Sequence, residues 1–345
     1  MPLPVSVKRL AWEEAARWDA FVADHPAGTP FHLTAWGRAI AATFGHDCHY
    51  LYAERDGAVA GVLPLIHIKS RIFGSSLISV AFAVYGGPLF HDPETHQALE
   101  AEAVRLRDAL GASLVEYRAI DGVSAAATTN ATRYATFVRA IDPDPEVNMK
   151  AIPRKQRAMV RKAIGLGLEA RLDEAFTDHY RLYSESLRNL GTPSFPARHF
   201  ANLKRFYGDD CDVLTVTHQG APVASVLSLY FRGTVLPYYG GGGALARQLA
   251  GNDFMYWALM EHARARGCTL FDFGRSKVGT GAYAFKKNWG FEPRPLHYQY
   301  LLAPGAAAPD LNPLNPKYQR MIKLWQRLPL WVANWAGPLI VRSLG

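Results

Sequence analysis

The pattern of hydrophobic and polar residues repeats along the chain. Residues 33–44 and 198–207 carry apolar positions at helical spacing, and a glycine after each run predicts the end of a helix. Two apolar, β-branched or aromatic runs then flank a polar turn, at Arg55-Asp-Gly57 and at His218-Gln-Gly220, which predicts a hairpin. The same local structure is therefore predicted twice.

Each hairpin is followed by a further strand, a helix and a buried strand. The predicted ranges are 80–85, 99–110 and 114–117 in the first half, and 235–239, 254–263 and 270–273 in the second. Between the halves, the prolines of Asp142-Pro-Asp-Pro145 and Pro153 break both helix and strand. We therefore expect domains at 1–145 and 146–303, and a C-terminal loop and amphipathic helix over 304–345.

The two halves also match residue by residue. Residues 44–58 align with 207–221 at a constant offset of 163, and residues 59–65 align with 223–229 after one inserted proline. Two further matches follow in the same order, Tyr85-Gly-Gly87 with Tyr239-Gly-Gly241 and residues 111–117 with 267–273. Four ordered matches indicate an internal duplication.

Composition is that of a folded protein with a positive charge. Of the 345 residues, 49% are hydrophobic and 20% are charged, which excludes a disordered, collagen-like or coiled-coil chain. The 38 Lys and Arg residues outnumber the 30 Asp and Glu residues by eight, and this favours anionic partners such as phosphates, nucleotides or RNA.

The cysteines and the chain start predict a reducing, cytoplasmic environment. Cys48, Cys211 and Cys268 are far apart and form neither a disulfide framework nor a zinc-binding spacing, so we interpret them as core thiols. The first residues lack a signal-peptide pattern, and no apolar stretch is long enough to span a bilayer.

Three motifs in the second half carry a family resemblance. Tyr238-Tyr-Gly-Gly241, residues 267–275 and residues 285–291 resemble the FemAB family, whose members are tandem-domain proteins of the GNAT acyltransferase superfamily. The likeness covers nearly the whole chain. More narrowly, residues 273–277, 285–290 and 328–338 resemble FemAB-related proteins associated with exosortase/PEP-CTERM exopolysaccharide loci.

The resemblance implies an α/β (α+β) fold of tandem duplicated GNAT-type acyltransferase domains, with mixed, mostly antiparallel sheets flanked by helices and a C-terminal helical tail. It implies transfer of an acyl or aminoacyl group to an amine of a cell-envelope or exopolysaccharide precursor. The donor is aminoacyl-tRNA or acyl-CoA, and no permanently bound cofactor or metal is expected. The alternatives are an acyl-CoA-dependent N-acyltransferase and a non-catalytic binding module of an exopolysaccharide system.

Four residues are candidates for catalysis. Lys286 matches the lysine of the family's Phe-Lys motif, which the resemblance places against the reacting carbonyl; its alternative is a solvated helix lysine. Asp272 interrupts an apolar strand, so it is either a structural ion pair or a site carboxylate. Tyr239 and Tyr283 are candidate proton donors to the leaving group.

Candidate binding residues surround this region. Arg275 and Lys277 follow the Asp272 strand and could hold an anion. Gly241 and Asn252 belong to a glycine-rich stretch before a helix start, where backbone N–H groups attract phosphate. Asp253 replaces the small residue of the ordinary GNAT phosphate motif, which argues against CoA; capping of the helix by Asn252 or Asp253 is the alternative.

Further candidates lie outside the motifs. Trp36 and Tyr85 could form the walls of an acceptor site, or pack in the core. Arg154, Arg157 and Arg161 belong to a basic run that could bind the phosphates of tRNA or of an anionic nucleotide- or lipid-linked precursor, or could face solvent. The Trp-rich segment 321–341 could lie at the inner membrane surface, or pack on the first domain.

Overall fold

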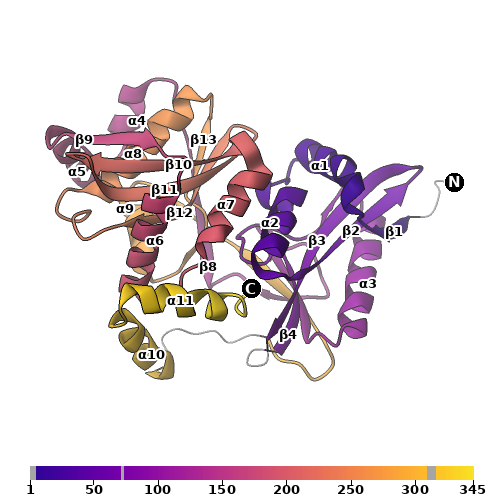
Figure 1. The fold of residues 1–345 in the computed structure, drawn as a ribbon. Coiled ribbons are helices and arrows are strands. Elements are labelled where there is room, and N and C mark those ends of the chain that lie inside the picture. The colour runs from indigo at the N-terminus through magenta and orange to yellow at the C-terminus, as the bar shows by residue number, and fades with distance from the viewer. Residues whose placement is uncertain (1–4, 71–73, 309–315) are drawn as a thin grey trace. The chain divides into compact units, whose positions relative to one another are not determined.

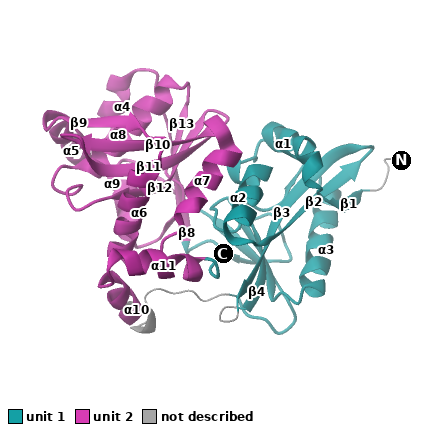
Figure 2. Ribbon diagram, viewed as in Figure 1, with its two compact units in different colours: residues 1–133, 295–311, 342–345 teal, residues 134–294, 312–341 magenta. Residues whose placement is uncertain are grey.

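The computed structural model describes residues 5–70, 74–308 and 316–345. The chain forms two compact units (Figures 1 and 2). Unit 1 comprises residues 1–133, 295–311 and 342–345, and unit 2 comprises residues 134–294 and 312–341. Neither unit is continuous in sequence, so the units do not coincide with the contiguous domains expected at 1–145 and 146–303.

Unit 1 is an open mixed sheet with helices on both faces. Its elements are β1 (Ser6–Arg9), α1 (Ala15–Asp24), α2 (Thr34–Phe44), β2 (Asp47–Arg55), β3 (Ala58–Ser70), β4 (Gly74–Ser79), β5 (Leu89–Phe90), α3 (Pro93–Ala109), β6 (Leu114–Ala119), β7 (Thr128–Asn130) and β16 (His297–Leu302). The strand order is β1-β2-β3-β4-β6-β16-β7, with β5 beside β3, and among the described residues β4 and β6 form the one parallel pair.

Alternation along β2 explains how the unit 1 sheet is buried on both faces. Leu51 and Ala53 belong to the apolar cluster that includes Leu99 of α3. The ring of Tyr50, which directly precedes Leu51 in the strand, instead packs on Trp18 of α1, with ring centroids 4.8 Å apart. Successive side chains of a strand point to opposite faces, so α3 covers one face and α1 the other.

Unit 2 has the same architecture with additional helices. Its elements are β8 (Tyr134–Ala140), α4 (Pro145–Ala151), α5 (Arg154–Gly165), β9 (Leu168–Leu172), α6 (Thr177–Leu190), α7 (Ala197–Tyr207), β10 (Cys211–His218), β11 (Ala221–Phe231), β12 (Thr234–Gly242), α8 (Gly251–Ala265), β13 (Leu270–Asp272), β14 (Ser276–Lys277), α9 (Gly281–Asn288), β15 (Pro293–Pro295), α10 (Pro316–Gln326) and α11 (Leu330–Val341). The strand order is β14-β8-β13-β12-β11-β10-β9, with β15 beside β8.

The two halves of the chain exchange their last strands. β8 is the last strand of the first half in sequence, yet it pairs with both β13 and β14 of unit 2. Reciprocally, β16 is the last strand of the second half, yet it pairs with both β6 and β7 of unit 1. Each sheet therefore obtains one of its interior strands from the other half of the sequence.

The hairpins confirm the duplication at the level of register. Asp56-Gly57 and Gln219-Gly220 all have positive φ, as a tight two-residue hairpin turn requires. Both hairpins also contain a register shift, between Ala53 and Glu54 in the first and between Val216 and Thr217 in the second. These shifts are 163 residues apart, the same offset as the aligned sequences.

The strand expected at 80–85 is wrong. β4 ends at Ser79, and Val80 and Phe82 both adopt positive φ, of 49° and 65°. This backbone cannot continue a strand. The counterpart expected at 235–239 is confirmed, because it lies within β12.

The C-terminal helices belong to unit 2, whereas one expectation packed this segment on the first domain. Both α10 and α11 contact α6, and Ala333, Gly337 and Val341 are the buried residues of α11. None of the helices that the structure describes is long and apolar enough to cross a membrane.

The backbone of α6 approaches the sheet closely at Gly241. A Cβ at Gly241 would lie 2.7 Å from the carbonyl oxygen of Leu182, whereas a Cβ at Gly240 would meet nothing nearer than 3.5 Å. We expect Gly241→Ala to lower the free energy of unfolding by about 1–3 kcal/mol, because backbone must move. Urea denaturation compares it with Gly240→Ala; equal stability of the two variants would contradict this packing.

Candidate active site

The candidate site lies where two parallel strands of unit 2 part. β12 and β13 pair only at Thr234 with Leu270 and at Val235 with Phe271. β12 continues to Gly242, whereas β13 ends at Asp272 and the chain turns away. Residues 272–275 therefore lie beside a stretch of β12 with which β13 no longer pairs.

Asp272 fixes the turn that follows β13. Its Oδ1 accepts a hydrogen bond from the backbone N–H of Gly274 at 2.7 Å, and a second from the hydroxyl of Thr136 at 3.3 Å. Gly274 has a φ of +66°, a conformation that favours glycine. The buried carboxylate thus holds a sharp turn, and Thr136 comes from the exchanged strand β8.

Lys286 on α9 closes over the same turn. Its Nζ donates to the carbonyl oxygens of Phe273, Gly274 and Arg275, at 2.6, 2.9 and 3.1 Å. An ammonium group has three donors, so all of them are engaged with backbone. Lys286 is therefore no solvated helix lysine, because it clamps the turn that Asp272 shapes.

Aromatic rings enclose the Lys286 side chain. Its Nζ lies 5.5 Å from the ring centroid of Phe137 and 5.9 Å from that of Phe273. Tyr283, one turn earlier on α9, also packs edge-on against Phe137, with centroids 5.2 Å apart. Phe137 is fully buried in β8 and is shared by Lys286 and Tyr283.

These surroundings bring the pKa of Lys286 to about 7, far below that of a free lysine. Burial is the main cause, because removal from water disfavours the charged amine; the Arg275 guanidinium acts in the same direction, and the Asp272 carboxylate opposes it. Near neutral pH the amine therefore exists in both protonation states. A group with such a pKa can accept and return a proton.

A hydrogen bond fastens α9 to α8. The buried Trp289 at the end of α9 donates from Nε1 to Oδ1 of Asp253, at 2.9 Å. Asp253 belongs to the first turn of α8, and burial raises the pKa of its carboxyl. Ala250 occupies the N-cap position of α8, so the alternative that Asn252 or Asp253 caps the helix is wrong.

The glycine-rich stretch serves close packing within unit 2. Gly241 lets the backbone of α6 approach β12, and a Cβ at Gly242 would lie 2.7 Å from Oδ1 of Asn252. The Asn252 side chain thus lies against the end of β12. Ligand binding by Gly241 and Asn252 stays a prediction.

The basic residues of α5 lie beside this stretch. Arg154 and Arg161 are exposed, and the half-buried Arg157 donates to the carbonyl of Lys150. Lys162 donates from Nζ to the carbonyl oxygen of Gln248 at 3.0 Å, which ties α5 to the loop before α8. Two exposed cations therefore share a helix with a residue anchored at that loop.

Arg275 and Lys277 lie next to β8. The Arg275 guanidinium stacks over the ring of Tyr134, 4.5 Å from its centroid, and Lys277 pairs in register with the same residue. Both side chains are partly accessible. Arg275 belongs to the turn that Lys286 clamps and Lys277 lies two positions beyond it, so both could meet an anion there.

Three predicted site residues lie in packed interiors instead. Tyr239 is buried against α6 and α7, with its hydroxyl 3.0 Å from Nε2 of His199. In unit 1, Trp36 is fully buried and donates to the carbonyl of Ala81, and Tyr85 packs edge-on near Phe31. Core packing was the alternative for Trp36 and Tyr85, and their rings offer no exposed face.

Sequence reasoning missed the contribution of β8 and the Asp253–Trp289 bond. No motif marks Thr136 or Phe137, since the strand precedes the second half in sequence. A signal for Trp289 did exist, because it lies within the Phe-Lys-Lys-Asn-Trp-Gly run that carries the resemblance. For its partner Asp253, the sequence suggests a charge near a phosphate or a helix cap, but not a bond to Trp289.

Comparisons with known proteins agree on the fold. Residues 149–287 match the family model described as an acetyltransferase (GNAT) domain. No curated protein matches the chain. Among solved structures, the crystal structure of FemX is similar, with a TM-score of 0.67 and 16% identity, over 93% of this chain and 100% of that one.

Two further structures share the arrangement. A tandem GNAT protein from the clavulanic acid biosynthesis pathway has a TM-score of 0.52 and 13% identity, over 89% of this chain and 100% of that one. The C-terminal domain of an Agrobacterium fabrum protein proposed to be a lysylphosphatidylglycerol synthetase has a TM-score of 0.56 and 14% identity, over 85% and 93%. The chain therefore has the fold of tandem GNAT proteins, and residues 149–287 match the model of a GNAT domain.

Proposed function

We propose that the protein is a FemAB-like transferase that moves an acyl or aminoacyl group to an amine of a cell-envelope or exopolysaccharide precursor. The observation that carries the proposal is Lys286, an enclosed lysine with a pKa of about 7 at the parting of β12 and β13. The FemX fold and the GNAT family match support the reaction class.

The chemistry requires proton movement that Lys286 can perform. The acceptor amine attacks the donor carbonyl carbon, a C–N bond forms, and the C–O or C–S bond to the leaving group breaks. In its neutral form Lys286 releases one backbone carbonyl and takes the proton that the attacking nitrogen loses. The resulting ammonium returns a proton to the leaving oxygen or sulfur, directly or through Tyr283 on the same helix.

The donor we favour is aminoacyl-tRNA. In ordinary GNAT enzymes, a pyrophosphate sits at the helix start that corresponds to α8. Here Asp253 puts a carboxylate into that first turn, and the Trp289 bond holds it there. Like charges repel, so acyl-CoA becomes the alternative donor. Arg154, Arg157 and Arg161 supply cations on the adjacent helix α5 for tRNA or precursor phosphates.

The acceptor we propose is an anionic, nucleotide- or lipid-linked amine, held by Arg275 and Lys277. The similar protein from Agrobacterium fabrum joins lysine to a phospholipid, according to its proposed name, which fits an aminoacyl transfer near a membrane. The exosortase/PEP-CTERM setting stays a proposal that rests on motifs 273–277, 285–290 and 328–338. Unit 1, with Trp36 and Tyr85 buried, contributes scaffold.

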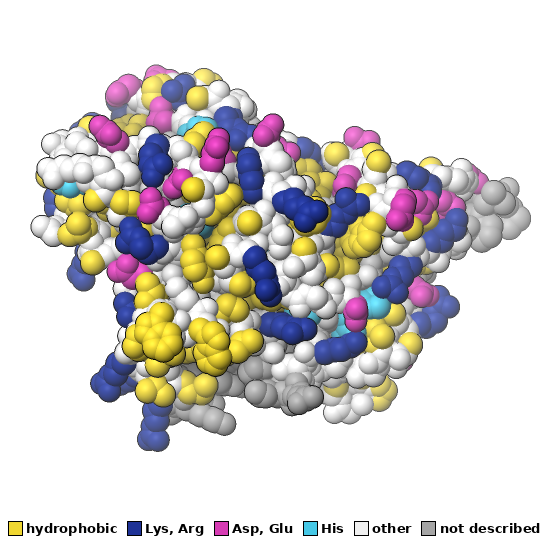
Figure 3. All heavy atoms as spheres, in the orientation of Figure 1, with side chains coloured by type: hydrophobic (Ala, Val, Ile, Leu, Met, Phe, Trp, Pro, Cys, Tyr) yellow, Lys and Arg dark blue, Asp and Glu magenta, His cyan; other side chains and the backbone are white. Residues whose placement is uncertain are grey.

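Helix α11 supports a location on the cytoplasmic face of the inner membrane. Trp331 and Trp335 are 74% and 71% exposed, and Leu339 continues the same helical face. Hydrophobic side chains gather over α11 in Figure 3, with Lys and Arg side chains nearby. An exposed Trp-rich face beside cations is typical of interfacial helices.

A second candidate function is a binding module without turnover. It is favoured by one observation, that all three donors of Lys286 already bind backbone carbonyls. In that case the lysine would stabilise the fold of the 273–275 turn only. Kinetics separate the two functions.

We expect Lys286→Met to lower kcat/KM by about 10²–10⁴-fold. The wild-type rate should rise with pH through about 7 and level off above, since the base must be deprotonated, and this rise should vanish in the variant. Lys287→Met, on the exposed side of α9, is the control. Retention of both rate and pH profile by Lys286→Met would leave the binding module as the better description.

Thermal shift distinguishes the donors. We expect tRNA or nucleotide sugars, and not CoA or acetyl-CoA, to raise the melting temperature of the wild type. Asp253→Asn keeps an acceptor for Trp289 but removes the charge, so it should gain stabilisation by CoA. Stabilisation of the wild type by CoA would overturn the preference for tRNA.

Vesicle flotation tests the α11 face. The double variant Trp331→Ser, Trp335→Ser should bind vesicles containing phosphatidylglycerol at least about tenfold more weakly, since burial of one large apolar side chain is worth roughly 1.5–3 kcal/mol. Leu172→Ser, which removes an exposed apolar residue from β9, is the matched control. Equal binding by all three proteins would exclude α11 as the membrane contact.

A further inference from the structure

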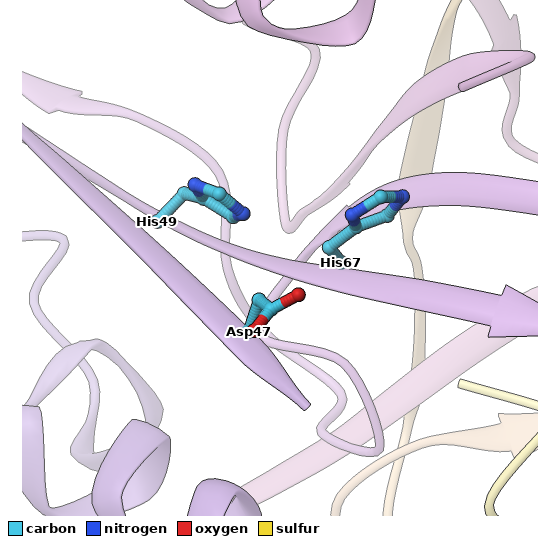
Figure 4. A group of neighbouring side chains, drawn as sticks. All are labelled: Asp47, His49 and His67. Carbon is cyan, nitrogen blue, oxygen red and sulfur yellow. The ribbon is translucent and has the colours of Figure 1, made fainter. Parts of the chain in front are cut away.

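Three metal-ligating side chains meet on the first hairpin of unit 1. Asp47 and His49 lie two residues apart on β2 and so point to the same face of the sheet. His67 lies on β3 directly opposite Asp47 in register. Figure 4 shows the Asp47 carboxylate and the two imidazole rings turned toward a common space.

The two histidines have ring nitrogens without partners. His49 is only 6% exposed, and among the described residues neither of its ring nitrogens has a hydrogen-bond partner. His67 is 2% exposed; its Nε2 lies 2.7 Å from the Ser75 hydroxyl, and its Nδ1 likewise finds no partner among the described residues. Buried polar groups are nearly always satisfied, so these orphaned nitrogens require an explanation.

We propose that Asp47, His49 and His67 bind a divalent transition-metal ion, with zinc as the best match. Two imidazole nitrogens and one carboxylate oxygen form a donor set that zinc prefers, and a fourth position remains for water or another ligand. A metal bond at each histidine would give a partner to a ring nitrogen that otherwise has no hydrogen-bond partner among the described residues.

Only small side-chain movements are needed to bring the three ligand atoms to zinc-binding distances. One ligand atom from each residue lies within 4.8 Å of the others, whereas two ligands of a tetrahedral zinc with bonds of about 2.1 Å lie roughly 3.4 Å apart. Asp47 is exposed, and its ion pair with Lys69, at 3.2 Å, is a surface contact of little energy. The carboxylate can therefore turn inward at little cost.

The surroundings favour metal binding in other ways. The Ser75 hydroxyl holds the His67 ring from the side opposite its free nitrogen, as a partner that orients a metal ligand does. The cluster belongs to unit 1 and Lys286 to unit 2, so the inference does not rest on the proposed transferase activity.

Calorimetric titration of the chelator-treated 345-residue protein with zinc chloride tests the site. We expect one ion per chain and a raised melting temperature in zinc. Visible absorption of bound cobalt(II), used as a second probe, reports imidazole and carboxylate ligation. Asp47→Asn, His49→Gln and His67→Gln should each weaken zinc binding at least about tenfold.

The control is His91→Gln, which removes an exposed histidine of unit 1 away from the cluster and should leave zinc binding unchanged. Asp47→Asn alters an exposed position, so it decides the matter even if a histidine variant fails to fold. The proposal is overturned if the wild type does not bind zinc, or if Asp47→Asn and the folded histidine variants bind it as the wild type does.

Discussion

The reciprocal exchange of strands is the constraint on which both units depend. Interior strands must have backbone partners on both sides, because unpaired N–H and C=O groups inside a sheet cost free energy. β8 fills the position between β13 and β14, and β16 fills the position between β6 and β7. Neither half of the sequence completes its own sheet, so we infer that the two halves fold together.

The exchange also builds the candidate site. β8 supplies Thr136, which donates to Asp272, and Phe137, whose ring packs on both Lys286 and Tyr283. The first half of the sequence has no helix between β7 and β8 that would correspond to α9, since only residues 131–133 separate those strands. Within the described part of the chain, unit 1 therefore has no counterpart of α9 to carry a lysine clamp, although the duplication gave both units the same sheet.

One carboxylate connects the fold of unit 2 to the choice of donor. Asp253 anchors Trp289, three residues after Lys286, and with it the end of α9. The same side chain occupies the first turn of α8, where a small residue would leave backbone N–H groups open to phosphate. In the proposed function, the carboxylate that anchors α9 is therefore also the group that disfavours a pyrophosphate at the start of α8.

In unit 1, a single register shift decides whether the metal cluster can form. Ala53 pairs with Gly61, whereas the next residue, Glu54, pairs with Val59. β3 therefore contains one extra residue at this point. Without it, Asp47 would face Ile66, and His67 would point to the other side of the sheet. The bulge therefore brings His67 onto the face that Asp47 and His49 share.

The sequence by itself determined what depends on near neighbours and on repetition. Helical spacing predicted α2 and α7, the two turn sequences predicted both hairpins, and the offset of 163 predicted two copies of one fold. The motifs around Lys286 predicted the reaction class.

Only the tertiary structure decided the strand exchange, the burial of Tyr239, Trp36 and Tyr85, the clamp on carbonyls 273–275 and the meeting of Asp47 with His67. Periodicity records which face of a strand is buried, but it carries no information on which distant strand lies alongside.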